Sequence, residues 1–339
     1  MRRIGLVLLL LLPAMAMAAV TGTVVNRSTG KPQAGAVVGL NRLGGGGIEL
    51  IDQATSDAQG KFTINRDIQG PHVLRTAFDG VTYNHMLPPG SPTTDLTLDV
   101  YPASKQPGAA KVSKHMLMFS PSGGQLTIEE TYLYSNDGTT AWNDPDNGTL
   151  HFYLPAAAGG KVQVNATAPG GMPIPAAVDK TSKADIYKVD FAVKPGETRF
   201  DVTYAVPHTE GSAYEGKIVT KDDNTYLIAP TGVTLTGANL SDMGQEPRSQ
   251  AHIYGLQGDT YKIELAGAAA PPQNAEAGDQ QDNGPAVEQI MPRLYSQATP
   301  LLALALGILA LGFILLYRAP TPGGQPATPA KEKNERARR

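Results

Sequence analysis

Cysteine is absent from the 339 residues of this sequence. This absence excludes disulfide scaffolds, thiol nucleophiles, cysteine-ligated zinc, iron–sulfur clusters and c-type haem attachment. An excess of positive charge is also lacking, because 28 lysines and arginines are set against 31 aspartates and glutamates, for a formal net charge of −3. Nucleic-acid binding depends on a basic surface, so we expect no nucleic-acid partner.

Spacings typical of catalytic sites are missing as well. None of the six histidines belongs to an H-E-x-x-H motif or to a pair two or four residues apart, the spacings that place two imidazoles on one helix or strand face. The G-x-S-x-G nucleophile motif does not occur either. We therefore expect a protein that is not an enzyme and that carries no cofactor and no metal.

The first 18 residues have the three parts of a secretory signal peptide. Arg2 and Arg3 form the basic start, residues 4–12 are an unbroken apolar run, and small residues end the segment at Ala18. The apolar run is too short to span a bilayer comfortably. We expect residues 1–18 to be a signal peptide cleaved before Ala19. The alternative is an uncleaved anchor, which would still export the chain that follows.

A second apolar run covers residues 300–317 and contains no charged side chain. A helix of this length would measure about 27 Å, close to the ~30 Å hydrocarbon thickness of a bilayer. The tail that follows it is basic, as expected on the cytoplasmic side. We therefore predict a transmembrane helix at 299–317 that contacts membrane lipid through residues 300–317, and a cytoplasmic tail at 318–339. The predicted location is a single pass through the cell (inner) membrane, with the N-terminal bulk of the chain periplasmic or extracellular.

The sequence between these segments predicts an all-β fold. It has almost no helical periodicity, and short alternating stretches are separated by glycine, proline, asparagine and aspartate. A proline- and glycine-rich stretch at 102–110 separates a small β-sandwich at 19–102 from a larger β region at 111–266. We expect the larger region to be one immunoglobulin-like or jelly-roll sandwich, or two small sandwiches split near Gly211. A flexible linker is expected at 267–298.

The expected strands are short and follow the alternating stretches. In the first region they are 20–25, 36–40, 48–54, 61–65, 73–78 and 96–101. In the second region they are 116–119, 125–134, 149–154, 161–165, 186–193, 198–206, 214–220, 224–229, 233–236, 252–255 and 261–265.

Two segments of the first region carry a recognisable pattern. Residues 22–40 read G-T-V-V-N-R-S-T-G-K-P-Q-A-G-A-V-V-G-L, and residues 55–64 read T-S-D-A-Q-G-K-F-T-I. Over roughly residues 20–101 the chain resembles the carboxypeptidase regulatory-like domain, a transthyretin-like β-sandwich. Because this module is a non-catalytic appendage in the peptidases that carry it, the resemblance implies an extracytoplasmic scaffold or adhesion module.

Five residues of this pattern are expected to shape turns. Gly30, Pro32 and Gly35 flank and stiffen one tight turn, and Asp57 with Gly60 closes a hairpin. The family usually continues with P-G-x-Y, whereas this chain has Q-G-P-H-V at residues 69–73, which indicates a differently shaped loop there.

The best candidate for a ligand site is Trp142 with Asp144, Asp146 and Asn147 beside it. Oxygen-bearing side chains on one loop are what Ca²⁺ requires, although the same residues are favoured in a plain hairpin turn. Trp142, the only tryptophan, is either an exposed contact for a partner or glycan or a cap on a sandwich core.

Together these expectations describe a non-enzymatic, membrane-anchored bacterial envelope protein. Its exported β-sandwich domains would act as scaffold or protein-binding modules, with an envelope protein or a glycan as the partner. The alternative is a carbohydrate- or calcium-binding adhesion module that rests on the Trp142 loop.

Overall fold

The computed structural model describes residues 19–44, 47–220 and 224–268. The predicted signal peptide, transmembrane segment and cytoplasmic tail lie outside the described residues, as does the predicted linker from residue 269 onward. Within the described part of the chain, no helix has the length and apolar character needed to cross a membrane.

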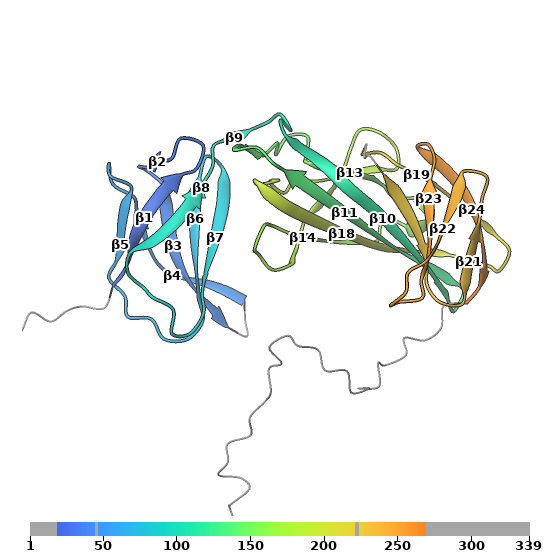
Figure 1. The fold of residues 1–339 in the computed structure, drawn as a ribbon, viewed down its shortest axis with the longest axis horizontal. Helices are drawn as coiled ribbons and strands as arrows, with labels where there is room; N and C mark the ends of the chain where they lie inside the picture. Colours follow the sequence, from blue (N-terminus) through green and yellow to red (C-terminus); the bar gives the residue numbers. More distant parts are fainter. Residues whose placement is uncertain (1–18, 45–46, 221–223, 269–339) are drawn as a thin grey trace, which may run out of the picture. The chain divides into compact units, whose positions relative to one another are not determined.

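The prediction of an all-β fold is confirmed. The described residues form the strands β1 to β24 and one short 3₁₀ helix, η1 (Ala156–Ala158) (Figure 1). Two clusters of buried side chains lie in different parts of the chain. We refer to residues 20–100, which supply most of the smaller cluster, as the N-terminal β region, and to residues 110–267, which supply all of the larger one, as the C-terminal β region.

The N-terminal β region consists of two four-stranded sheets around one core. The first sheet contains β1 (Val20–Asn26), β2 (Lys31–Pro32), β5 (Lys61–Ile64) and β8 (Leu96–Val100), with β8 parallel to β1. The second has the order β4 (Gly47–Thr55), β3 (Val37–Gly44), β6 (His72–Phe78) and β7 (Val81–Leu87), and all its pairs are antiparallel. Alternation in β5 buries Phe62 and Ile64 and exposes Lys61 and Thr63, as one buried sheet face requires.

Close packing of β1 against its neighbours leaves no room for a side chain at Gly22. A Cβ atom at this position would lie 2.4 Å from the Leu96 carbonyl oxygen and 2.8 Å from a ring carbon of Phe62. We expect Gly22→Ala to lower the free energy of unfolding of the N-terminal β region by about 1–3 kcal/mol, because β1 and β8 must move apart to make room for the added methyl group. Urea denaturation measures this change.

Gly44→Ala is the matched control for this prediction. Gly44 also lies in a strand, but a Cβ atom there would meet nothing within 4 Å. Equal urea midpoints for the two variants would show that the close approach at Gly22 does not limit the packing.

The C-terminal β region is built on one eight-stranded sheet and two three-stranded sheets. The large sheet has the order β15 (Ile174–Pro175), β14 (Val162–Thr167), β18 (Gly196–Pro207), β11 (Gln125–Asn136), β10 (Ala110–Ser122), β20 (Thr225–Ala229), β23 (His252–Leu256) and β22 (Leu240–Gln245). The small sheets are β13 (Leu150–Tyr153), β17 (Ile186–Val189) and β16 (Val178–Lys180), and β19 (Ala213–Lys217), β24 (Thr260–Gly267) and β21 (Val233–Thr236).

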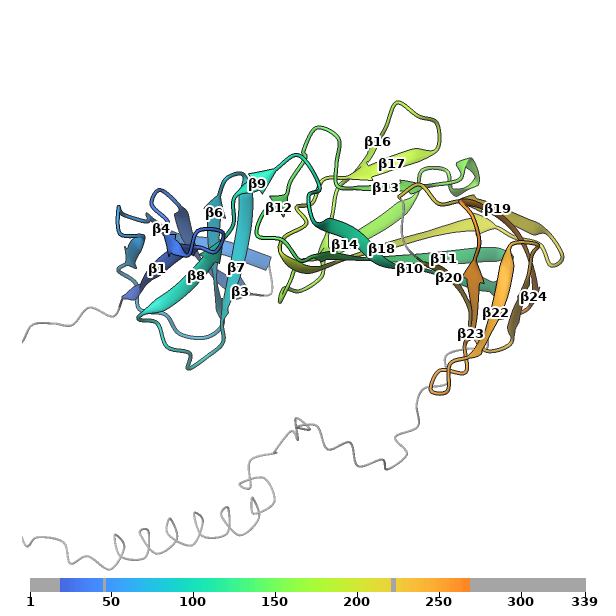
Figure 2. The same cartoon turned by 45° about the horizontal axis from the view of Figure 1, so that its top comes forward.

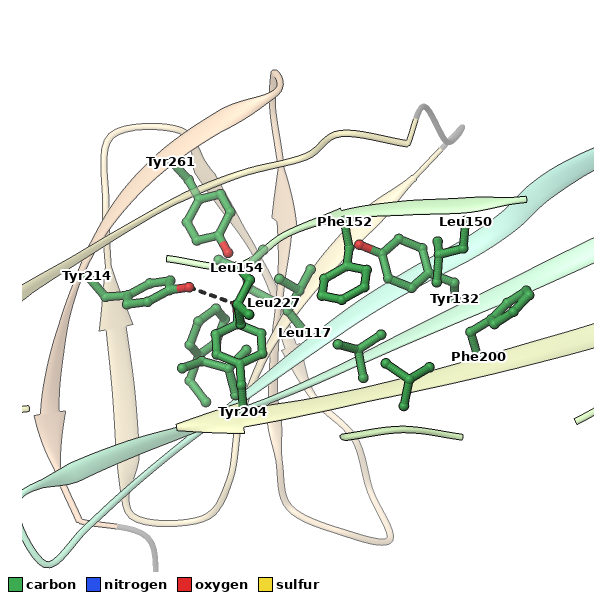
Figure 3. Packing of buried hydrophobic residues seen from close by; sticks show 14 of the residues in the cluster. Leu117, Tyr132, Leu150, Phe152, Leu154, Phe200, Tyr204, Tyr214, Leu227 and Tyr261 are labelled. Atoms are coloured by element: carbon green, nitrogen blue, oxygen red, sulfur yellow. Dashed lines mark hydrogen bonds between the residues drawn. The ribbon is translucent and has the colours of Figure 1, made fainter. Parts of the chain in front are cut away.

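A single core spans this region. β10 pairs with β11 on one side and with β20 on the other, so the large sheet continues past Gly211. Side chains from before and after that position, such as Phe152 and Leu227, belong to the same buried cluster (Figure 3).

The segment expected to be a plain separator, residues 102–110, contains a strand. β9 (Ala103–Ser104) pairs in parallel with β12 (Ala141–Trp142), and Ala141 is fully buried in the N-terminal core cluster. Lys194 makes a further connection, because its ammonium donates to the Thr82 carbonyl oxygen and lies 5.2 Å from the centre of the Tyr83 ring. Burial lowers the pKa of Lys194 to about 8.

Candidate functional site

The loop between β12 and β13 holds its aspartates in place with hydrogen bonds from within the chain. The carboxylate of Asp144 accepts hydrogen bonds from the Asn147 backbone nitrogen, at 3.2 Å, and from its side-chain amide, at 2.9 Å. The side-chain bond lowers the pKa of Asp144. Gly148 then closes the turn with a positive φ of 80°. Asp144 is therefore the buried turn residue of this loop.

Asp146 is exposed and paired. Its carboxylate lies 2.5 Å from the Lys105 ammonium, and its backbone carbonyl accepts a hydrogen bond of 2.6 Å from Lys188. Because Lys105 neutralises the only carboxylate exposed at the tip of the loop, the loop does not present the several unpaired oxygens that calcium needs. Among the described residues, no group of three or more histidine, aspartate or glutamate side chains is placed to hold a metal ion.

Trp142 is neither fully exposed nor fully buried. Its ring packs against Tyr134 of the C-terminal core, with the ring centres 6.1 Å apart, and its indole nitrogen donates to the Lys105 carbonyl oxygen at 3.2 Å. The side chain is half-buried and also lines a surface pocket. Core contacts therefore fix the ring where a ligand can reach it.

This pocket, which we call the Trp142 pocket, has a volume of about 670 Å³. Asp146 and Asn147 lie on its wall with Trp142, and further lining residues come from the sheet β13–β17–β16. Figure 2 shows the three strands of this sheet. The volume falls within the range of small-molecule sites. Of the four predicted ligand residues, three therefore meet at one cavity, and Asp144 shapes the loop beside them.

Three lysines line the pocket. Lys180 ends β16, Lys183 lies in the turn that follows and Lys188 lies on β17. No ion pair joins any of them to a carboxylate within the described ranges. Because the carboxylate of Asp146 is already paired with Lys105, the lining carries a net positive charge.

His151 on β13 also lines the pocket, directly opposite Lys188 in the strand register. Its backbone exchanges two hydrogen bonds with the Thr220 hydroxyl, at 3.3 and 2.6 Å. Burial lowers the pKa of His151, and the positive charges of Lys188 and Lys183 lower it further. The imidazole therefore favours its neutral form.

Sequence reasoning did not select the lysines or His151. The lysines lie more than 30 residues beyond the Trp142 loop, and only the pairing of β13 with β17 brings them to it. The available signal was the spacing of Lys180, Lys183 and Lys188 within one short hairpin, which also carries Asp179 and Asp185.

The turn residues of the N-terminal β region adopt special backbone geometry. Gly30, Gly35 and Gly60 have φ values of 68°, 75° and 72°, which favour glycine. Pro32 pairs with Val25 in the β1–β2 ladder. The carboxylate of Asp57 accepts backbone hydrogen bonds from Gln59 and Lys61, at 2.9 and 2.8 Å, as in an Asx turn.

A cluster of hydrogen-bonded polar groups, separate from the Trp142 pocket, lies inside the C-terminal core. Glu130 accepts hydrogen bonds from the hydroxyls of Tyr132, at 2.8 Å, and Tyr204, at 3.1 Å. The Tyr204 hydroxyl also bonds to that of Tyr214 at 2.9 Å, as the dashed line in Figure 3 shows. Glu130 is only 4% exposed. Since a ligand cannot reach this carboxylate without opening the core, we regard the cluster as structural.

Comparison with known proteins gives no family. No protein-family model matches the sequence, and no curated protein matches it. An M1 zinc metallopeptidase from Deinococcus radiodurans matches at 11% identity and a TM-score of 0.27, over 47% of this chain and 42% of that one. Native yeast LTA4 hydrolase matches at 7% identity and a TM-score of 0.31, over 49% of this chain and 30% of its own. The chain spans less than half of either structure, and likeness at these scores establishes neither a shared fold nor a shared activity.

Proposed function

We propose that this chain is a non-enzymatic, membrane-anchored bacterial envelope protein whose exported β regions act as a scaffold and binding module. The observation that supports a binding role most is the Trp142 pocket. Its Trp142 ring is held by a contact with Tyr134 of the core, the pairing of β13 with β17 places His151 opposite Lys188, and its carboxylate is paired with a lysine. Such a lining suits recognition of a ligand better than acid–base chemistry on one.

The proposed topology rests on the sequence of the two ends. Residues 1–18 would direct export, residues 299–317 would anchor the chain in the inner membrane, and residues 318–339 would remain cytoplasmic. Both β regions would then lie outside the cytoplasm.

We further propose that the N-terminal β region is a transthyretin-like sandwich of the carboxypeptidase regulatory-like type. Two four-stranded sheets around one core, with positive φ at Gly30, Gly35 and Gly60, support this assignment. For the C-terminal β region we propose an enlarged sandwich of immunoglobulin-like or jelly-roll type, which its single core supports.

The alternative function is an adhesion module that binds carbohydrate or calcium. The lysines around Trp142 and the Lys105–Asp146 ion pair favour carbohydrate over calcium, because a positively charged lining repels a cation.

Membrane fractionation of the full chain tests the proposed anchoring. The native chain is expected to stay with the membranes until detergent is added. Leu306→Arg with Leu309→Arg is expected to release the chain into the exported soluble fraction, because each arginine at the centre of a span costs roughly 3 kcal/mol of insertion free energy. Leu306→Ile with Leu309→Ile is the control and should remain in the membrane. A native chain that dissolves without detergent would contradict the proposal.

A further inference from the structure

The chemistry of the Trp142 pocket indicates what kind of ligand it would accept, and this inference rests on the binding role proposed above. Two exposed lysines, Lys180 and Lys183, and the half-buried Lys188 reach the cavity from one hairpin. Register places Asp179 opposite Lys188, but no ion pair joins them in the described structure. Three lysines therefore line one cavity, with the Lys180 ammonium 5.9 Å from the centre of the Tyr187 ring, and their charge makes the lining an anion-binding surface.

Within the part of the chain that the structure describes, Asp146 is the one acidic residue of the lining, and it does not cancel this charge. Asp146 pairs with Lys105, and both carboxylate oxygens of Asp144 accept hydrogen bonds from Asn147. Lys188 donates only to a backbone carbonyl of the loop, and that bond leaves its charge uncompensated.

The remaining lining residues suit a sugar more than a bare anion. Ser182 brings a hydroxyl group to the cavity, whereas the hydroxyls of Thr181 and Thr220 on the same wall are bonded to the backbone of Ile186 and His151. Trp142 brings an indole held in place by its contacts with Tyr134 and Lys105. Hydroxyls can both donate to and accept from sugar hydroxyls. An indole offers a rigid apolar surface to the carbon–hydrogen face of a sugar ring. A phosphate or sulfate ion alone would leave the indole unused.

We propose that the Trp142 pocket binds an acidic saccharide. Its carboxylate, phosphate or sulfate group would contact Lys180, Lys183 and Lys188, and its ring would lie against Trp142. The net positive charge of the pocket lining explains the preference for an acidic sugar over a neutral one. The indole of Trp142 and the hydroxyl of Ser182 explain the preference for a sugar over a simple ion.

Calorimetric titration of the full chain in detergent tests this proposal with three probes. These are trigalacturonate as an acidic saccharide, galactotriose as its neutral counterpart, and inorganic phosphate as a bare anion. We expect trigalacturonate to bind at least about tenfold more tightly than either of the others, because only it engages both the lysines and the indole.

Substitutions inside and outside the Trp142 pocket test whether the saccharide binds there. Lys180→Gln with Lys183→Gln removes two exposed charges and is expected to weaken trigalacturonate binding about tenfold or more. Lys114→Gln with Lys161→Gln makes the same charge change at exposed positions outside the pocket and should leave binding unchanged. Trp142→Phe should weaken trigalacturonate binding while leaving phosphate binding as it was.

Each outcome decides the proposal. Equal affinity for phosphate and trigalacturonate would show a site for anions only and would overturn it. Equal affinity for the neutral and acidic sugars, no heat with any probe, or equal effects of the two double-lysine variants would also overturn it. Membrane fractionation does not depend on this binding, so failure of the ligand proposal and failure of the proposed anchoring are separate results.

Discussion

Raising the pH from 10 to 11 is expected to unfold the C-terminal β region. Five of its tyrosines lie almost entirely inside the core, and burial raises the pKa of each well above its usual value near 10. They are Tyr132, Tyr134, Tyr204, Tyr214 and Tyr261. In the unfolded chain these tyrosines ionise near pH 10, so above that pH the unfolded state binds fewer protons than the folded state and stability falls as pH rises.

The size of this loss decides the outcome. One pH unit above the unfolded pKa costs about 1.4 kcal/mol for each tyrosine, so five cost about 7 kcal/mol by pH 11. This is comparable to the whole net stability of a typical domain. In the N-terminal β region, Tyr83 is the tyrosine whose pKa burial raises in the described structure, so we expect that region to lose less stability over the same range.

Tyrosinate absorbance and far-ultraviolet circular dichroism, recorded on the same samples, check this prediction. The buried tyrosines should ionise in one cooperative step that coincides with loss of sheet signal. Tyrosines that ionise gradually from pH 10 while the sheet signal persists would show that they are accessible to solvent, contrary to the structure.

Glu130→Ala is expected to lower the free energy of unfolding of the C-terminal β region by about 3–5 kcal/mol. The substitution removes the acceptor for the hydroxyls of Tyr132 and Tyr204, which lie 2.8 and 3.1 Å from its carboxylate oxygens. Two buried hydroxyls then lose a partner, and a cavity opens beside them.

Neighbouring and conservative variants make this experiment specific. Glu129 is exposed on the same strand, and Glu129→Ala should change the free energy of unfolding by no more than about 0.5 kcal/mol. Glu130→Gln should recover part of the loss, because its amide oxygen still accepts a hydrogen bond. Urea denaturation measures all three. A Glu130→Ala variant as stable as Glu129→Ala would contradict the structural role of the buried cluster.

Most of the strand pattern could be predicted from the sequence, because a sheet with one buried face alternates apolar and polar residues. The segment 233–236 coincides with β21. The expected strand at 116–119 is only part of β10, which runs from residue 110 to 122, because the outward lysines and serines of this strand interrupt the apolar signal. β7 was missed for a similar reason: Asn84 and His85 interrupt its apolar residues.

The pairing of the strands could not be predicted. Whether residues 111–266 form one sandwich or two depended on a parallel pair, β10 with β20, whose members lie more than 100 residues apart. Local sequence carries no information on such a contact. The lining of the candidate pocket could be found only in part from the sequence for the same reason, because Trp142, Asp146 and Asn147 are neighbours in sequence whereas the pocket lysines reach them through β17.

The burial of Glu130 could have been predicted from the alternation of apolar and polar residues along β11. Leu126, Ile128, Tyr132 and Tyr134 of β11 all face the core, and Glu130 occupies the same phase of the strand. A carboxylate at an inward position requires buried hydrogen-bond donors, and the tyrosines of the same region supply them.

The anchored chain is proposed to present the Trp142 pocket outside the cytoplasm. Labelling with a membrane-impermeant amine reagent tests this topology directly. Intact spheroplasts containing the full chain would be labelled before or after lysis, and modified lysines identified by mass spectrometry. We expect Lys180 and Lys183 to react in intact spheroplasts, whereas Lys331 and Lys333 of the tail should react only after lysis. Tail lysines labelled in intact spheroplasts, or pocket lysines labelled only after lysis, would contradict it.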